Sequence, residues 1–367
     1  MIMMNLLPCP VKPKPGEIFS SWVCAVALEH GLSLNAFCNY FFPKHIMCKR
    51  DIDKYADDGV WKFFADISGV EHQQVEKTVL KRKLKRVMDI SDNMTNAPWI
   101  THSPNIYTVR NSYGNCYCPE CLSSDKKPYL RLTWRLAFVT FCPEHRALLH
   151  DRCSKCDAQV SLYRLSPPNG RINLCHSCGY DLSCTPRKQY KISDDQMKVQ
   201  NSFLSLMDFP KVIMPGGDAI PTDKFFIILH EIAYLCSKSK ELAPAIERAV
   251  RMVYGKTGAV DPTRHEFLET YPPEKRFVFL NFAYWILHVW PCNFIFECIQ
   301  RHQLDGRRTY PLQALPCERW CKSNNEFPFE GGCTNGIKQL QNVSSPDVIK
   351  ARLGVRGIKP KVLKVNI

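Results

Sequence analysis

The first third of the chain carries apolar residues at the three- and four-residue spacing of amphipathic helices. Segment 17–30 places five of them on one helical face, namely Ile18, Trp22, Val23, Val26 and Ala27. Gly31 then supplies a stop, and Ser33 supplies an N-cap for a second helix with its own apolar face: Leu34, Phe37, Cys38 and Phe41. The pattern predicts two helices joined by a tight turn, as in a helix-turn-helix or an ordinary helical hairpin.

Two more helices are predicted over residues 61–67 and 71–88, separated by Ser68 and Gly69. The second has an apolar stripe made of Val79, Leu80, Leu84, Val87 and Met88. Its basic residues are expected to turn outward: Lys81, Arg82, Lys85 and Arg86. These four are candidate contacts for a nucleic acid or a partner, although such a run is usually a solvated helix face.

Changes in composition predict a mainly α-helical chain in three parts. Residues 91–115 are rich in Asn, Ser, Thr and Pro, so residues 1–115 are expected to form a helical, helix-turn-helix-like domain that ends in a linker. Residues 116–190 predict a tandem zinc-binding block. Residues 191–367 predict a C-terminal helical domain, because segments 225–235, 243–253 and 277–299 have helical spacing, followed by a basic tail from residue 350.

Four ligand pairs follow one another in the central block, each with two residues between its members. They are Cys118 with Cys121, Cys142 with His145, Cys153 with Cys156, and Cys175 with Cys178. A tight turn can aim both members of such a pair at one ion, and two pairs complete a tetrahedron. Since every ligand is Cys or His, the block predicts two closed, structural zinc sites. Sequential pairing is the simplest arrangement, and a cross-braced arrangement would use the same eight residues.

Between the first two pairs, the segment YLRLTWRLAFVTF fits either a strand or a short helix. Its Arg131 and Arg135 are candidate contacts for a nucleic acid or a partner carboxylate. Packing of both side chains along the protein is the alternative. Cys116, His150, His176 and Cys184 lie near the pairs but outside any clean pair, so we expect them to be neighbours of the metal sites.

The bulk composition limits the classes of protein. Hydrophobic residues at 45% and charged residues at 23% are typical of a globular chain. The 19 cysteines, without an export signal, favour metal binding over disulfides, and a net charge of +14 favours polyanionic partners. Segment 277–299 is hydrophobic but interrupted by polar residues, which predicts a buried helix and no membrane span.

Motifs of several enzyme classes are incomplete. Gly255-Lys256-Thr257 resembles the end of a phosphate-binding loop, but Val250 stands where the first glycine belongs. His230-Glu231 lacks the second histidine of a zinc-protease helix, and His265-Glu266 lacks the spacing of a nucleic-acid deaminase. We therefore expect no enzymatic activity.

Three elements of the sequence resemble the TniQ family, the transposition-targeting proteins that include TnsD and the small TniQ subunits of CRISPR-associated transposons. The proline-led GEIFSSW segment holds Glu17, Ser20, Ser21 and Trp22. The CPEC and CPEH pairs enclose Tyr129, Arg131, Trp134 and Arg135, and CSKC with CHSC completes the pattern. The resemblance covers roughly residues 8–185, whereas segment 290–294 (WPCNF) is much weaker support.

The resemblance implies a cytoplasmic bacterial adaptor without catalytic residues, in which the eight metal ligands carry over residue by residue. Members of this kind connect a target-recognising entity to the AAA+ regulator TnsC. Short members ride on an RNA-guided Cascade complex, often as a dimer, and would touch DNA or RNA indirectly or weakly. TnsD-type members instead read an attachment site on DNA themselves. The moderate length of this chain favours the Cascade-bound kind, and the TnsD-like reader is the alternative.

Overall fold

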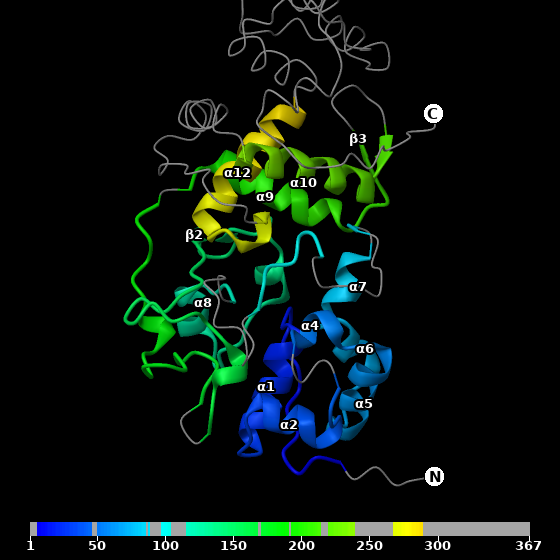
Figure 1. The fold of residues 1–367 in the computed structure, drawn as a ribbon, viewed down its shortest axis with the longest axis vertical. Helices are drawn as coiled ribbons and strands as arrows, with labels where there is room; N and C mark the ends of the chain where they lie inside the picture. Colours follow the sequence, from blue (N-terminus) through cyan, green and yellow to red (C-terminus); the bar gives the residue numbers. More distant parts are fainter. Residues whose placement is uncertain are drawn as a thin grey trace, which may run out of the picture. The chain divides into compact units, whose positions relative to one another are not determined.

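The computed structural model describes residues 6–45, 50–85, 87–88, 97–103, 115–167, 170–190, 192–213, 219–238 and 267–288 (Figure 1). The chain divides into two compact units. The first comprises residues 1–211, 221–230 and 266–277, and the second comprises residues 212–220, 231–265 and 278–367. Several predicted features lie outside the described residues: Arg86, most of the linker, helix 243–253, the motifs at 250–257 and 265–266, segment 290–294 and the basic tail.

The predicted helical pair at the N-terminus is present as α1 (Phe19–Glu29) and α2 (Leu34–Phe41). The five residues predicted to form the inner face of the first helix are all at most 2% exposed. Gly31 adopts a left-handed φ of +70° between the helices, and the Ser33 hydroxyl accepts a hydrogen bond from Ala36 N at 3.2 Å. Helix α1 is also buried at Phe19, Ser20, Ser21 and Cys24, so it lies inside the first unit.

In the described residues between α2 and the cysteine-rich block lie α4 (Ile52–Tyr55), α5 (Asp58–Ser68), α6 (His72–Glu76) and α7 (Leu80–Leu84). The prediction of one continuous helix over residues 71–88 is wrong. The helix is interrupted at Thr78, whose hydroxyl donates to Val75 O at 2.6 Å and whose carbonyl oxygen accepts from Phe19 N at 3.0 Å. The bond to Phe19 takes this carbonyl out of a continuous helical ladder.

The helices of the N-terminal part share an aromatic core. The Phe64 ring stacks on Phe37 with centroids 5.8 Å apart and meets Phe19 edge-on at 6.0 Å. Ile18 N donates to Leu130 O at 3.0 Å, which joins this core to the cysteine-rich block within the first unit. The three-part division predicted from composition stays a prediction, but its first two parts belong to one compact unit.

Regular structure in the cysteine-rich block is short. It consists of α8 (Pro119–Ser124), the 3-10 helices η1 (Leu132–Arg135), η2 (Leu162–Arg164) and η3 (Leu182–Cys184), and the strands β1 (Phe141–Cys142) and β2 (Ala147–Leu148). The strands pair antiparallel, with Phe141 opposite Leu148. Segment 129–141, which fitted a strand or a helix, thus contains a 3-10 turn and the start of a two-residue strand.

Downstream elements are mainly helical: α9 (Asp194–Leu206), the hairpin β3 (Lys211–Ile213) and β4 (Ala219–Pro221), α10 (Thr222–Lys238), η4 (Leu268–Thr270) and α12 (Pro273–His288). Helix α10 confirms the helix predicted over 225–235, and α12 covers the described start of 277–299. Among the described residues, no helix is long and apolar enough to cross a membrane. The chain is therefore mainly α-helical, with a cysteine-rich centre.

Residues 266–277 return to the first unit and are tied into its interior. The buried Arg276 guanidinium donates to Ala137 O at 2.5 Å and to Cys116 Sγ at 3.4 Å. The Glu269 carboxylate accepts from Trp99 N at 2.8 Å and lies 2.8 Å from His230 Nε2. His230, part of the incomplete protease motif, thus has an internal carboxylate partner, in keeping with a structural role.

Candidate metal centre

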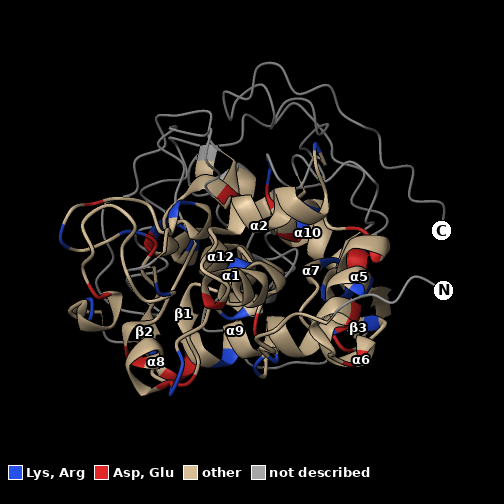
Figure 2. Cartoon of the chain, turned by 90° about the horizontal axis from the view of Figure 1, so that it is seen from below, with Lys and Arg blue, Asp and Glu red and all other residues tan. Residues whose placement is uncertain are grey.

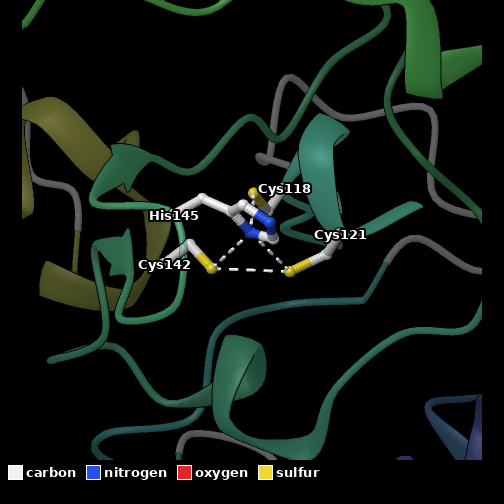
Figure 3. Close-up of side chains that lie close together, drawn as sticks. All are labelled: Cys118, Cys121, Cys142 and His145. Atoms are coloured by element: carbon white, nitrogen blue, oxygen red, sulfur yellow. Dashed lines mark hydrogen bonds between the residues drawn. The ribbon is translucent and has the colours of Figure 1, made fainter. Parts of the chain in front are cut away.

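The first cluster brings together the first two ligand pairs (Figure 3). Cys118 is the N-cap of α8, where Pro119 opens the helix, and Cys121 lies within its first turn. Cys142 ends β1, and His145 lies in the turn that leads to β2. His145 Nδ1 is 3.2 Å from Cys121 Sγ, 3.6 Å from Cys142 Sγ and 3.7 Å from Cys118 Sγ.

These separations match one tetrahedral ion. Zinc–sulfur bonds of about 2.3 Å and zinc–nitrogen bonds of about 2.0–2.1 Å imply S···S separations of about 3.8 Å and S···N separations of about 3.6 Å. The Cys121 and Cys142 sulfurs are 3.5 Å apart, and all four ligand atoms lie within 4.8 Å of one another. The first cluster could therefore hold a zinc ion.

The second cluster is formed by Cys153, Cys156, Cys175 and Cys178. Its sulfurs approach one another at 3.7 Å between Cys153 and Cys178 and at 3.6 Å between Cys156 and Cys175. These separations also fit a tetrahedral zinc ion. Both clusters pair sequentially, which is one of the two arrangements that the spacing allowed.

Three of the four ligand pairs share one backbone turn. The residue after each pair donates its N–H to the carbonyl of the pair's first cysteine at 2.9 Å: Arg146 to Cys142, Asp157 to Cys153, and Gly179 to Cys175. All three residues have a left-handed φ, between +50° and +67°. Gly and Asp are ordinary residues for that conformation, whereas Arg146 adopts it at a steric cost.

Nearby hydrogen-bond donors lower the pKa of two of the cysteine ligands, Cys142 and Cys178. Hydrogen bonds from the Cys118 and Cys121 thiols, with a further one from the His145 backbone N–H, lower the pKa of Cys142. The backbone N–H of Tyr180 lowers the pKa of Cys178 to about 7. Thiolates are the form that binds metal, and a bound cation deprotonates its cysteine ligands outright.

The glutamates inside the first two pairs add negative charge that the spacing gave no reason to expect. Glu120 Oε2 is 3.2 Å from Cys118 Sγ, and Glu144 Oε2 is 3.7 Å from Cys121 Sγ. Arg187 offsets part of this charge, because its Nε is 3.7 Å from Glu120 and its Nη2 donates to His145 O at 2.7 Å. Arg187 lies far along the chain, so the sequence carries no signal for its role.

The two clusters differ in exposure. Cys118, Cys121 and Cys142 are at most 1% exposed, whereas Cys156 is exposed and Cys178 is partly exposed. The neighbouring residues named from the sequence have other contacts: Cys116 binds Arg276, and His176 Nε2 lies 3.1 Å from Gln159 O. Neither is among the four ligands of a cluster.

Arg131 and Arg135 make internal contacts instead of facing outward. The Arg131 guanidinium lies over the Tyr129 and Trp134 rings, 4.3 and 4.8 Å from their centroids, and forms a two-point pair with Asp125 at 2.6 and 2.9 Å. The Arg135 side chain is 3% exposed and binds Asp51 and Asp53. Internal packing, the alternative noted from the sequence, is what the structure has.

Figure 2 marks lysines and arginines along the chain in blue, and those of the basic helix segment have different neighbours. Arg82 forms ion pairs with Asp58 at 2.6 Å and with Glu76 at 3.2 Å. Lys85 is exposed and Lys81 is partly exposed, while Arg86 is outside the described residues. A contact between these residues and a nucleic acid or partner stays a prediction.

The GEIFSSW segment fastens the N-terminal lead to the cysteine-rich block. Glu17 is fully buried, and its Oε1 accepts from the Ser21 hydroxyl at 2.8 Å. The same hydroxyl accepts from Leu130 N at 3.1 Å, and Trp22 Nε1 donates to Val11 O at 2.8 Å. Burial raises the pKa of Glu17, while the Lys14 ammonium opposes that rise. The motif is thus part of the interior framework.

Comparison with known proteins gives one family match. Residues 8–149 match a protein-family model described as TniQ. The matched span begins in the proline-rich lead and includes the whole first cluster, from Cys118 to His145. No sequence among curated proteins matches the chain.

Proposed function

Residues 8–149 of this chain belong to the TniQ family, and on that premise we propose that the protein is the adaptor between an RNA-guided Cascade-type complex and a TnsC-type AAA+ regulator. The family domain itself implies target selection in transposition, and the family is one of targeting proteins, not enzymes. The observation that carries the proposal is the match to residues 8–149, with a complete Cys3His cluster inside it.

The metal clusters have a structural role in this proposal. Each set consists of Cys and His side chains only, so a bound zinc ion would have four protein ligands and no position for a reacting water. Cys118, Cys121, Cys142 and His145 would hold one ion, and Cys153, Cys156, Cys175 and Cys178 the other. Such an ion would fix α8 against the β1–β2 hairpin.

Three of the arginines that the sequence named as candidate contacts are Arg82, Arg131 and Arg135, and their state supports an adaptor over a direct DNA reader. Direct reading of base edges relies on free donors, of which arginine is the commonest. In the described part of the chain, Arg131 and Arg135 are held by carboxylates inside the protein, and Arg82 is held by two carboxylates at the surface. Their side chains would have to give up these pairs before they could contact a base.

A TnsD-like reader is the second candidate, and α2 favours it. If the helical hairpin binds DNA, its second helix would enter the major groove, because α1 is buried. Asn35, Asn39 and Tyr40 lie on the outward side of α2, where Tyr40 is 77% exposed. Asparagine pairs with adenine edges, and the net charge of +14 would assist binding to phosphates.

Affinity purification of the tagged protein, expressed together with its neighbouring genes, would test the proposal. Recovery of a stoichiometric complex that contains guide RNA, and of an AAA+ protein, is the expected result. Mass measurement of the same material would show whether the protein is a dimer. Recovery of the protein alone, with one preferred DNA duplex, would overturn the adaptor proposal.

An Asn39→Ala variant separates the two candidates. A direct reader should lose sequence preference at one base position while its salt dependence stays unchanged, because the variant removes no phosphate contact. An adaptor should keep both its guide complex and its weak duplex binding. Cys121→Ser, which damages the first cluster, serves as the control for loss of the folded domain.

A further inference from the structure

A hollow of about 700 Å³ opens on the first compact unit, beside the second metal cluster. Two stretches of chain form its wall, one at the end of η2 and one that leads into the CHSC pair. The wall includes the polar side chains of Arg164, Ser166, Arg171 and His176. Apart from the zinc ligand Cys175, its residues take no part in the function proposed above.

Close packing and a backbone turn hold the wall in place. A Cβ at Gly170 would lie only 2.8 Å from Ser166 O and 3.0 Å from Leu28 Cδ2 of α1, so this part of the wall is packed against the helix. Leu174 N donates to Arg171 O at 2.9 Å, which closes the turn that carries Arg171. The polar side chains of the wall are therefore mounted on the framework of the first unit.

Arg171 is an exposed cation in this wall. Its guanidinium has no ion pair and no hydrogen bond with another described residue. Asp181 is close enough for the two charges to interact, but it is not part of the wall. Its Oδ1 accepts from Asn173 Nδ2 and from Ser183 N, both at 2.9 Å. The Arg171 guanidinium is thus accessible to a ligand in the hollow.

The charge of the wall favours an anion. Arg164 and Arg171 supply two positive charges, and none of the described residues that line the hollow is acidic. The opposing charge in the wall is that of Cys175, which is 6% exposed. It is one of four thiolates that would share a net charge of about −2 with a bound zinc ion. This share, even with the nearby Asp181, reduces the positive charge without cancelling it.

A phosphate of a double-stranded nucleic acid suits this chemistry. Guanidinium groups pair with phosphate oxygens in a planar fork, and serine hydroxyls such as that of Ser166 are common further donors to a nucleic-acid backbone. Single strands are usually held by stacking on aromatic rings, but no Phe, Tyr or Trp is among the described residues of the wall. The net charge of +14 would attract such a polyanion.

We propose that this hollow receives a backbone phosphate of duplex DNA, with Arg171 as the main contact and with Arg164 and Ser166 beside it. Such a contact carries no sequence information, so it is compatible with an adaptor. The choice of DNA rests on the targeting role proposed above, whereas the phosphate site depends on neither the guide complex nor the regulator. The second metal cluster would hold a DNA contact in place as well as support the fold.

Fluorescence anisotropy of the full-length, zinc-loaded protein with a short labelled DNA duplex tests the site. Arg171→Gln should weaken binding by about eightfold at about 0.1 M salt, because one counterion fewer is released from the duplex. For the same reason, the slope of log K against log salt should fall by about 0.9. Arg171→Lys keeps the charge and should keep the slope.

Matched variants separate a phosphate contact from a change in net charge. Lys126→Gln removes one charge from an exposed side chain outside the hollow that also has no ion pair with a described residue. It should change the affinity by less than about twofold, because salt screens a charge that makes no contact. If Arg171→Gln loses zinc or melts at a lower temperature, Arg164→Gln takes its place and should weaken binding in the same direction.

A second duplex of unrelated sequence and a single-stranded RNA of equal length complete the test. Arg171→Gln should weaken both duplexes by the same factor and the RNA by less. These measurements use the protein alone, so their outcome is independent of the purification that tests the adaptor role.

Several results would overturn the proposal. Equal losses in Arg171→Gln and Lys126→Gln would show that only net charge matters. A loss confined to one duplex would indicate a base contact, and a loss confined to the RNA would place a single strand in the hollow. No binding of either duplex, or unchanged affinity and salt slope in folded Arg171→Gln protein, would mean that the hollow holds no phosphate.

Discussion

Arg135→Met would leave two carboxylates inside the first unit without their counter-ion. Arg135 Nη1 lies 2.7 Å from Asp53 Oδ2, its Nη2 binds Asp51, and the same Nη2 donates to Thr101 O at 2.9 Å. The Asp53 side chain is completely enclosed. Burial raises the pKa of Asp53 to about 6, while the Arg135 charge holds it down. Without Arg135, that pKa should rise further.

The expected loss follows from this geometry. Removing one partner of a buried ion pair typically costs about 3–5 kcal/mol, and two orphaned carboxylates with one orphaned carbonyl favour the upper end. For a unit of roughly 200 residues, each kcal/mol shifts Tm by about 2–4 °C, so the melting temperature should fall by about 6–20 °C. The replacement by methionine keeps most of the side-chain volume, which limits the contribution of a cavity.

Thermal melting and urea unfolding at pH 7 would measure the loss, with Arg82→Met as the control. Arg82 pairs with Asp58 at 2.6 Å, but the two side chains are 38% and 60% exposed, so that variant should lose at most about 1 kcal/mol. The loss for Arg135→Met should also shrink from pH 7 to pH 5, because a proton on Asp53 then removes the unpaired charge. Equal losses in the two variants would refute the reasoning.

Three further predictions concern other parts of the first unit. Cys121→Ser should release zinc and lower Tm more than Cys156→Ser, since Cys121 is buried and Cys156 exposed; equal changes in zinc content and melting would contradict this. Ser193→Ala removes the capping box of α9 and should cost about 1 kcal/mol in urea unfolding, whereas Ser205→Ala at an exposed position of the same helix should cost little. Burial lowers the pKa of His150 to about 4, so the folded protein should lose stability as pH falls below about 6.5, and His150→Gln should flatten that loss if zinc is retained.

Local patterns in the sequence predicted the features that depend on near neighbours. The apolar face of α1, the Ser33 cap and the stop at Gly31 each involve residues within a turn or two of one another. The pairs of metal ligands could also be identified from the sequence, because one tight turn forms each pair. The choice between sequential and cross-braced pairing was not, since it depends on which turns meet in space.

Contacts between distant residues account for the failures. The helix predicted over 71–88 is broken into α6 and α7 at Thr78, whose carbonyl bonds to Phe19, a contact outside any local pattern. Arg135 fitted an outward contact equally well until its partners Asp51 and Asp53, more than 80 residues away in sequence, were located. No spacing rule connects an arginine to carboxylates that far along the chain.

The return of residues 266–277 to the first unit has a consequence for synthesis on the ribosome. Trp99 and Ala137 emerge early, but their partners Glu269 and Arg276 are translated only much later. Until residues 266–277 are translated, the Trp99 amide and the Ala137 carbonyl lack the Glu269 and Arg276 partners that they have in the folded first unit. A slow stretch of translation before residue 266 would prolong this interval, and chaperones should associate with the incomplete first unit during it.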